Sequence, residues 1–120
     1  LGFRSNVTLE LCQLLDAGQI ETVHFLCAVW FRSVEGELYD ELHSKLAMRG
    51  QHSVAAARNH AKLQLFQFAD GREFCLEGSG NLRSCRNVET CCFTHDGDLV
   101  AFHKKWITEL IVKAQKESNQ

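Results

Sequence analysis

The almost continuously apolar run at 22–31, TVHFLCAVWF, constrains the fold of this chain more than any other segment. It is rich in β-branched and aromatic residues, which is typical of a strand buried on both faces. Segments with the apolar period of a helix flank it on both sides. The leucines that carry this period are Leu11, Leu14, Leu15, Leu38, Leu42 and Leu46. A buried strand between two amphipathic helices predicts an α/β domain.

Capping and stop signals set the expected bounds of the two helices. Ser5 or Asn6 is expected to cap a first helix that begins at Val7 and stops at Gly18. The second helix is expected at 35–49, before another glycine.

The second half of the chain has the pattern of short strands and one final helix. Extended segments are expected at 52–57, 60–68, 73–77 and 88–94, with turn signals at Asp70-Gly71 and Asp96-Gly97. A helix should follow from about Asp98, and its apolar stripe would be Leu99, Phe102, Trp106, Leu110 and the stem of Lys113. We therefore expect one domain over 1–120, a mixed β-sheet layered with helices, with 116–120 as a flexible tail.

Composition limits the kind of partner and the compartment. A net charge of -2 argues against coating nucleic acid by bulk electrostatics. No apolar run reaches the length of a membrane span, and no signal peptide is recognisable, so we expect a cytoplasmic protein that does not bind membranes. The cysteines are then expected to be reduced thiols, most of them small core residues. They are Cys12, Cys27, Cys75, Cys85, Cys91 and Cys92.

Two short polar motifs lie on either side of the expected hairpin. In His60-Ala61-Lys62 the imidazole and the ammonium group share a face if the segment is a strand. In Gly78-Ser79-Gly80-Asn81 the hydroxyl and the amide share a face, and the glycines allow close approach to a ligand. Each motif alone is weak, because a surface strand edge or an ordinary turn explains it equally well. The hairpin would place the two polar faces side by side.

Together the motifs resemble the phospholipase D superfamily, which carries His-x-Lys on one strand and Gly-Ser-x-Asn on the next. Arg86-Asn87-Val88-Glu89 resembles the downstream segment in which that family carries a carboxylate. The resemblance is closest to single-motif members from phages and bacteria, and it extends from about residue 5 to residue 112. It implies a phospholipase D-like fold.

The resemblance also implies a chemistry, a metal-independent hydrolysis of phosphodiesters. His60 would attack phosphorus to form a phosphohistidine, and a second His60, from another copy of the chain, would protonate the leaving group. Lys62, Ser79 and Asn81 would hold the phosphate oxygens. Glu89 would accept a hydrogen bond from His60 and fix its orientation. Neither a metal nor another cofactor is expected, because protein donors supply the stabilisation.

A single His-x-Lys motif means that a complete site needs two chains, so we expect a homodimer. Arg58, Arg83 and Arg86 are candidates for a basic rim that contacts a nucleic-acid backbone, although solvated surface arginines are an equal alternative. The absence of an amphipathic membrane-binding segment disfavours lipid. Nuclease-like activity is therefore expected by elimination.

Two departures from the family keep a non-catalytic alternative open. The aspartate expected five positions after the lysine is Gln67, and the hairpin is longer than usual, with Asp70 in its turn. The family also has further strands before the first helix, so we expect a shortened domain. The alternatives are an inactive module that binds phosphodiesters or serves as an assembly subunit, and a structural domain in which the motif is accidental.

A zinc site is the remaining alternative, because Cys85, Cys91, Cys92 and His95 lie close in sequence. Cys92 and His95 have a workable spacing, but Cys91 and Cys92 would point to opposite faces of a strand. We expect core cysteines instead. The histidines outside the motif are expected to be surface or hydrogen-bonded structural residues, and the Trp106 stripe to be core. These histidines are His24, His43, His52, His95 and His103.

Overall fold

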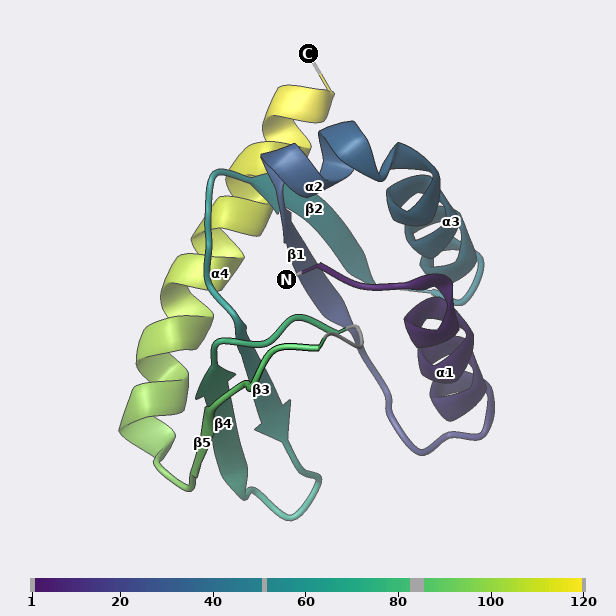
Figure 1. Cartoon of the computed structure of the whole chain (residues 1–120). Coiled ribbons are helices and arrows are strands. Elements are labelled where there is room, and N and C mark those ends of the chain that lie inside the picture. Colours follow the sequence, from purple (N-terminus) through teal and green to yellow (C-terminus); the bar gives the residue numbers. More distant parts are fainter. Residues whose placement is uncertain (1, 51, 83–85, 120) are drawn as a thin grey trace.

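The computed structural model describes residues 2–50, 52–82 and 86–119 and has a mixed α/β architecture (Figure 1). Its elements are α1 (Ser5–Asp16), β1 (His24–Ala28), α2 (Val29–Val34), α3 (Gly36–Ala47), β2 (Ser53–Ala57), β3 (Leu63–Gln67), β4 (Glu73–Gly78), β5 (Cys91–Thr94) and α4 (Gly97–Ser118). The α/β class expected from the sequence is confirmed.

The described strands form two separate sheets rather than one. Strands β1 and β2 pair in parallel, and β3, β4 and β5 form an antiparallel sheet in that order. Helices α1 and α3 lie on one side of the parallel pair, while the long α4 runs along both sheets (Figure 1). Helix α4 thereby joins the two halves of the molecule.

The main core lies between the parallel pair and helices α1 to α3. Phe3 is buried at its centre, with its ring 5.1 Å from that of Phe25 and 4.9 Å from that of Phe31. The other buried members are Cys27, Tyr39, Leu42, Leu46 and Val54. Their burial provides the main stabilisation of this half of the molecule.

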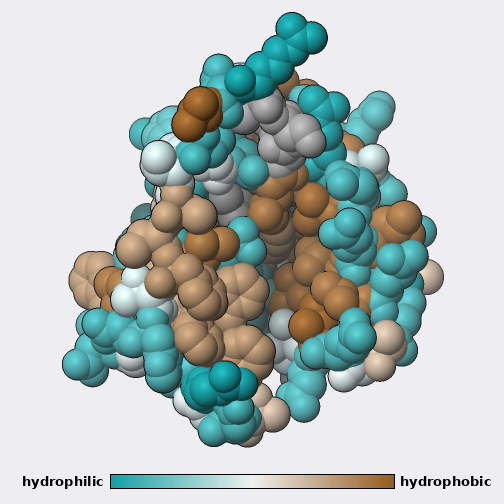
Figure 2. All heavy atoms as spheres, turned by 60° about the horizontal axis from the view of Figure 1, so that its bottom comes forward, coloured by the Kyte–Doolittle hydropathy of each residue, from teal (hydrophilic) through white to brown (hydrophobic). Residues whose placement is uncertain are grey.

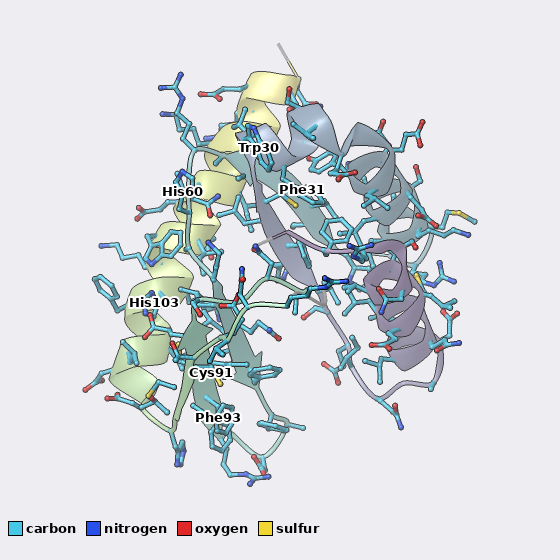
Figure 3. All side chains as sticks on the ribbon, in the orientation of Figure 1. Trp30, Phe31, His60, Cys91, Phe93 and His103 are labelled. Atoms are coloured by element: carbon cyan, nitrogen blue, oxygen red, sulfur yellow. The ribbon has the colours of Figure 1, made fainter. Side chains whose placement is uncertain are left out.

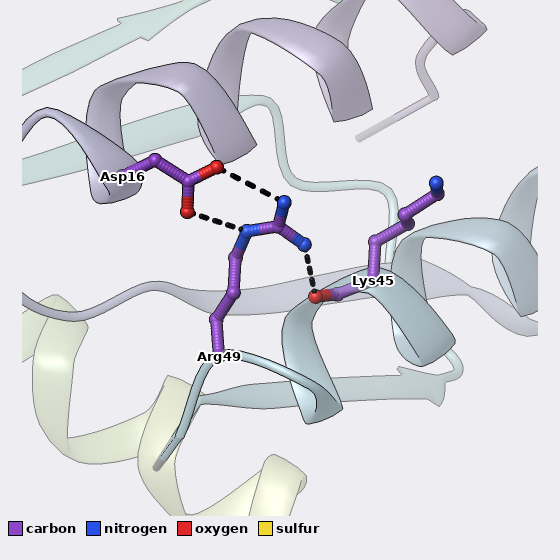
Figure 4. Close-up of polar contacts among 3 residues, drawn as sticks. All are labelled: Asp16, Lys45 and Arg49. Atoms are coloured by element: carbon purple, nitrogen blue, oxygen red, sulfur yellow. Dashed lines mark hydrogen bonds and ion pairs between the residues drawn. The ribbon is translucent and has the colours of Figure 1, made fainter.

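A bidentate salt bridge links the end of α1 to the end of α3 (Figure 4). Arg49 donates from Nε to Asp16 Oδ1 at 2.8 Å and from Nη2 to Oδ2 at 3.1 Å. Its Nη1 donates to the carbonyl oxygen of Lys45 at 2.9 Å. The hydrogen bonds from Arg49 lower the pKa of the Asp16 carboxyl. The pair is exposed, so its geometry orients the helices more than it stabilises them.

The expectation of a long buried strand at 22–31 is wrong in its second half. Strand β1 ends at Ala28 and the chain turns into helix α2, which leaves Trp30 68% exposed (Figure 3). The helical turn directs Phe31 into the core, so tertiary packing outweighs the β propensity of this run. The expected cap of α1 is also wrong: Arg4 occupies the cap position, and no side chain makes a capping hydrogen bond.

Several boundaries in the second half also differ from expectation. Strand β3 begins at Leu63 rather than at residue 60, and β5 begins at Cys91 rather than at residue 88. Residues 116–118, expected to be a flexible tail, continue helix α4. The buried face of α4 is rotated by one position, because Val100, His103 and Ile111 are buried while Phe102 is 67% exposed.

Cysteines divide between core and surface. Cys12, Cys27 and Cys75 are buried, as expected for small core residues, whereas Cys91 and Cys92 are exposed. All five are free thiols, and Cys85 lies outside the described residues. Burial raises the pKa of the Cys27 thiol to about 11, which keeps it protonated near neutral pH.

Candidate functional site

The two polar motifs meet at the open end of the β3–β4 hairpin. Strands β3 and β4 pair from Leu63 opposite Glu77, and the next backbone hydrogen bond runs from Gly78 N to Lys62 O at 3.0 Å. Gly78 also lies directly against β5, where a Cβ atom would overlap the carbonyl oxygen of Thr90. A glycine is therefore required here by close approach of two backbones.

Ser79 links the end of β4 to the segment before β5. Its backbone nitrogen donates to Thr90 O at 3.0 Å, and its hydroxyl accepts from Thr90 N at 3.1 Å. The same hydroxyl donates to a carboxylate oxygen of Glu89. Ser79 and Glu89, which are ten residues apart in sequence, are thus held in direct contact.

Asn81 is fixed through its side-chain oxygen. Gly2 N donates to Asn81 Oδ1 at 2.8 Å, and Leu82 N donates to Gly2 O at 2.8 Å. Phe3 and Leu82 form an isolated parallel bridge beside them. Because Oδ1 is engaged with the backbone, the amide nitrogen is the group of Asn81 that remains to meet a ligand.

A shallow pocket of about 130 Å³ lies among these segments. Three of the residues predicted to form the site, Lys62, Asn81 and Glu89, line it together. The remaining lining residues are Gln64, Leu76, Gly78, Gly80, Leu82, Thr90 and Cys91. The residues that line the pocket thus include a lysine, an asparagine and a glutamate, together with two leucines.

His60 is not among the described residues that line this pocket. It is exposed on the loop between β2 and β3 (Figure 3). Asn59 anchors this loop, because its Nδ2 donates to Cys27 O at 3.0 Å and to Ala57 O at 3.1 Å. Lys62 Nζ lies 3.5 Å from the carbonyl oxygen of His60. Both motif residues precede β3, so the expectation that a strand places them on one face is wrong.

Three other candidate residues, Arg58, Arg86 and Gln67, are not among the described residues that line the pocket. Arg58 and Arg86 are exposed, and Arg83 lies outside the described residues. Gln67, which stands where the family carries an aspartate, accepts a hydrogen bond from Lys104 Nζ at 3.1 Å. This contact turns Gln67 toward helix α4, away from the pocket.

A second polar cluster lies between β4 and α4, and the sequence did not suggest it. His103 is buried, and its Nε2 is 2.8 Å from Glu77 Oε1, while Trp106 Nε1 donates to His103 Nδ1 at 3.0 Å. The fully buried Cys75 completes a group of possible metal ligands within 4.8 Å of one another. Burial raises the pKa of the Cys75 thiol.

Hydrogen bonding assigns the second cluster a structural role. The indole N–H of Trp106 can only donate, so His103 Nδ1 is the acceptor, and His103 Nε2–H donates to Glu77 Oε1. A metal bound at Nε2 would require the ring proton to move to Nδ1, where it would face the indole N–H of Trp106. His103 is therefore a hydrogen-bonded structural histidine, as the sequence indicated for histidines outside the motif.

The zinc pair considered from the sequence is not assembled. Cys92 Sγ lies 3.4 Å from Thr94 Oγ1, on the face of β5 toward Glu77, its cross-strand neighbour. His95 instead stacks on the ring of Phe74, 4.7 Å away, on the opposite face. The alternation of a β-strand separates the two candidate ligands.

Comparisons with protein-family models, with curated proteins and with solved structures give no match to this chain. In the described part of the chain, no helix has both the length and the apolar composition needed to cross a bilayer.

Proposed function

We propose that this chain provides half of a metal-independent, nuclease-like phosphodiesterase site, which a second copy of the chain completes. The observation that carries the proposal is the pocket shared by Lys62, Asn81 and Glu89, with Ser79 bonded to Glu89. These residues come from three separate segments, and the hairpin and β5 bring them together. They are the residue types that the resemblance to the phospholipase D superfamily implies.

The polar groups of the pocket fit a phosphodiester. The ammonium group of Lys62 offers a positive charge to a non-bridging oxygen, and the amide of Asn81 offers neutral donors. Ser79 Oγ–H, now donated to Glu89, can turn to a phosphate oxygen because a hydroxyl rotates freely. Donors of these kinds stabilise the charge that develops on the phosphoryl oxygens.

Catalysis in this proposal needs His60 to turn toward the bound phosphate. The imidazole of one copy attacks phosphorus, and the bond from phosphorus to the leaving oxygen breaks as His60 of the second copy donates a proton to that oxygen. Water then attacks the phosphohistidine, gives its proton to the second His60 and releases the phosphate product. Exposure of His60 on the β2–β3 loop leaves the ring accessible for this movement.

A binding module without turnover is the second candidate. It is favoured by the position of His60 outside the pocket and by Gln67 in place of an acid. In that case Lys62 and Asn81 would hold a phosphodiester, and His60 would contribute nothing to the chemistry.

Hydrolysis of bis(4-nitrophenyl) phosphate and of single- and double-stranded DNA in excess EDTA tests the proposal. The phosphodiesterase predicts metal-independent cleavage that His60→Ala lowers by at least about 100-fold. His43→Ala is the matched control, because His43 is an exposed histidine on α3 and its loss should leave the rate unchanged. Cleavage that persists in His60→Ala would overturn the assignment of the nucleophile.

Binding measured with the same proteins separates the two candidates. DNA binding without cleavage, weakened by Lys62→Ala and unchanged by His60→Ala, would establish the binding module. If the unaltered protein neither binds nor cleaves any of these substrates, the pocket is not a phosphodiester site.

A further inference from the structure

The outer face of the β3–β5 sheet carries a row of exposed aromatic rings. Side chains alternate between the two faces of each strand. Glu77 and Gln67 reach His103 and Lys104 of α4, so their face of the sheet is covered by that helix. The opposite face carries Phe66, Phe74 and Phe93, flanked by Phe68 and His95. These five residues are called the aromatic face below.

The rings of the aromatic face contact one another, and all of them except the half-buried Phe74 are exposed. Phe74 lies 5.0 Å from Phe93 with the planes 7° apart, and Phe66 meets Phe93 at 6.4 Å. Phe93 is 60% exposed and Phe66 is 38% exposed. Figure 2, which turns this end of the molecule forward, shows hydrophobic side chains gathered on its surface. The rings support one another and form a preformed platform.

The aromatic face is continuous with the pocket that Lys62, Asn81 and Glu89 line. Gln64, Leu76 and Phe93 form one row across the three strands, and the first two of these residues line the pocket. Cys91, also in the pocket lining, lies two positions before Phe93 on the same face of β5 (Figure 3). Two residues along a strand span about 7 Å. The ring of Phe93 therefore lies about as far from the pocket as a base lies from the phosphate of its own nucleotide.

One cationic residue lies at each end of this face. Lys62 lies at the pocket end, and at the other end the guanidinium of Arg72 lies 5.2 Å from the ring centre of Phe68. Arg72 also pairs with Asp70 in the turn. The paired strand positions between these two cations carry no carboxylate on this face, because Glu73 and Glu77 occupy the face toward α4.

We propose that the aromatic face binds the bases of a single-stranded nucleic acid whose backbone phosphate occupies the neighbouring pocket. The proposal rests on the proposed function and names its substrate class. Bases stack on aromatic side chains without regard to sequence, and only unpaired bases expose their faces for this. The guanidinium of Arg72 extends the stacking surface at the far end. A duplex hides its base faces and cannot use this platform.

Fluorescence anisotropy with a labelled oligothymidylate of about eight nucleotides tests the proposal, since single-domain sites cover about 4–16 nucleotides. Phe93→Ala and Phe66→Ala should each weaken binding by about 5- to 100-fold. Phe93→Leu, which keeps an apolar side chain but removes the ring, should also weaken it. Phe102→Ala is the matched control, because Phe102 is 67% exposed on α4 and not on the aromatic face.

Two further probes identify what the face recognises. An abasic oligomer of the same length keeps the phosphates but has no bases, and it should bind more weakly than oligothymidylate, as should a duplex. Equal affinity for the abasic oligomer, unchanged affinity in Phe93→Ala, or full retention of affinity in Phe93→Leu would overturn the proposal. So would conversion of a dimer to monomers by Phe93→Ala with no change in oligonucleotide affinity, since the face would then be a protein interface.

The failure of this inference is distinguishable from failure of the proposed function. If bis(4-nitrophenyl) phosphate is hydrolysed through His60 but the aromatic variants bind oligothymidylate normally, the proposed hydrolysis is supported. The proposal that the aromatic face binds bases is then wrong. If base-dependent binding is lost in the aromatic variants but neither bis(4-nitrophenyl) phosphate nor DNA is cleaved, binding of bases by the aromatic face is supported and the proposed hydrolysis is wrong.

Discussion

At the scale of single residues, Gly78 decides whether the two halves of the candidate site meet. It ends β4, donates to Lys62 O and lies directly against the backbone of Thr90 and Cys91. At Gly80, two residues later, the three atoms nearest to the place of a Cβ all belong to the side chain of Glu89, at 3.6 Å or more. The structure therefore leaves no room for a side chain at Gly78 but tolerates one at Gly80.

Alanine substitutions at the two positions should therefore differ in their effect on stability. Gly78→Ala should lower the free energy of unfolding by about 1–3 kcal/mol, because the methyl group forces β4 and β5 apart. It should also weaken phosphodiester binding, since Lys62 and Thr90 shift with the strands. Gly80→Ala should be within about 1 kcal/mol of the unaltered protein, because its contacts are ordinary. Urea unfolding measures both, and equal effects would contradict the close approach at Gly78.

At the scale of elements, the β3–β5 sheet depends on helix α4 for its covered face. Glu77 from β4 accepts from the buried His103 of α4, and Trp106, one turn further on, fixes the tautomer of that histidine. Cys75 lies in the same layer and is fully buried. This polar cluster orients the helix on a small sheet, in the manner of satisfied buried networks generally.

Changing the acceptor without changing the donor tests this cluster. Glu77→Leu should lower the free energy of unfolding by about 1–3 kcal/mol, because the Nε2–H of His103 is left buried without an acceptor. Glu77→Gln keeps an acceptor oxygen of similar reach and should cost less than Glu77→Leu. Thermal unfolding of the unaltered protein and of both variants at the same pH gives the comparison. If the two variants are equally stable, the hydrogen bond does not hold the helix.

At the scale of the whole molecule, α4 unites two sheets that carry different parts of the proposed function. The parallel pair anchors the His60 loop through Asn59, and the antiparallel sheet carries the pocket and the aromatic face. Because one chain supplies a single His60, the proposed chemistry belongs to a pair of molecules rather than to one.

Subunit mixing should reveal that dependence. Equal amounts of unaltered and His60→Ala chains are unfolded together and refolded, so that dimers form at random. About a quarter of these dimers contain two intact histidines, and the activity should fall to about a quarter of that of the same total amount of unaltered protein. Activity of about one half would show that each chain acts alone and would contradict the shared site. His43→Ala chains mixed in the same way should leave the activity unchanged, and light scattering should report a dimer throughout.

Local pattern alone determined the types and the order of the elements other than α2. The leucine periods of α1 and α3, the turn signal at Asp70-Gly71 and the alternating segments around it are local features, so they could be recognised in the sequence. The adjacency of the two motifs was also predictable, because a hairpin has few possible geometries. Lys62 and Gly78 are indeed hydrogen-bonded neighbours.

Long-range packing decided the rest. Val29–Val34 has strand propensity but is helical, because Phe31 completes the core from that position. His60 lies outside the pocket, on a loop that Asn59 ties to β1 through a contact across 32 positions of sequence. The aromatic face and the Cys75–Glu77–His103 cluster arise from cross-strand and helix–sheet contacts between distant residues. Periodicity reports which face a residue lies on, and only the tertiary structure determines what that face meets.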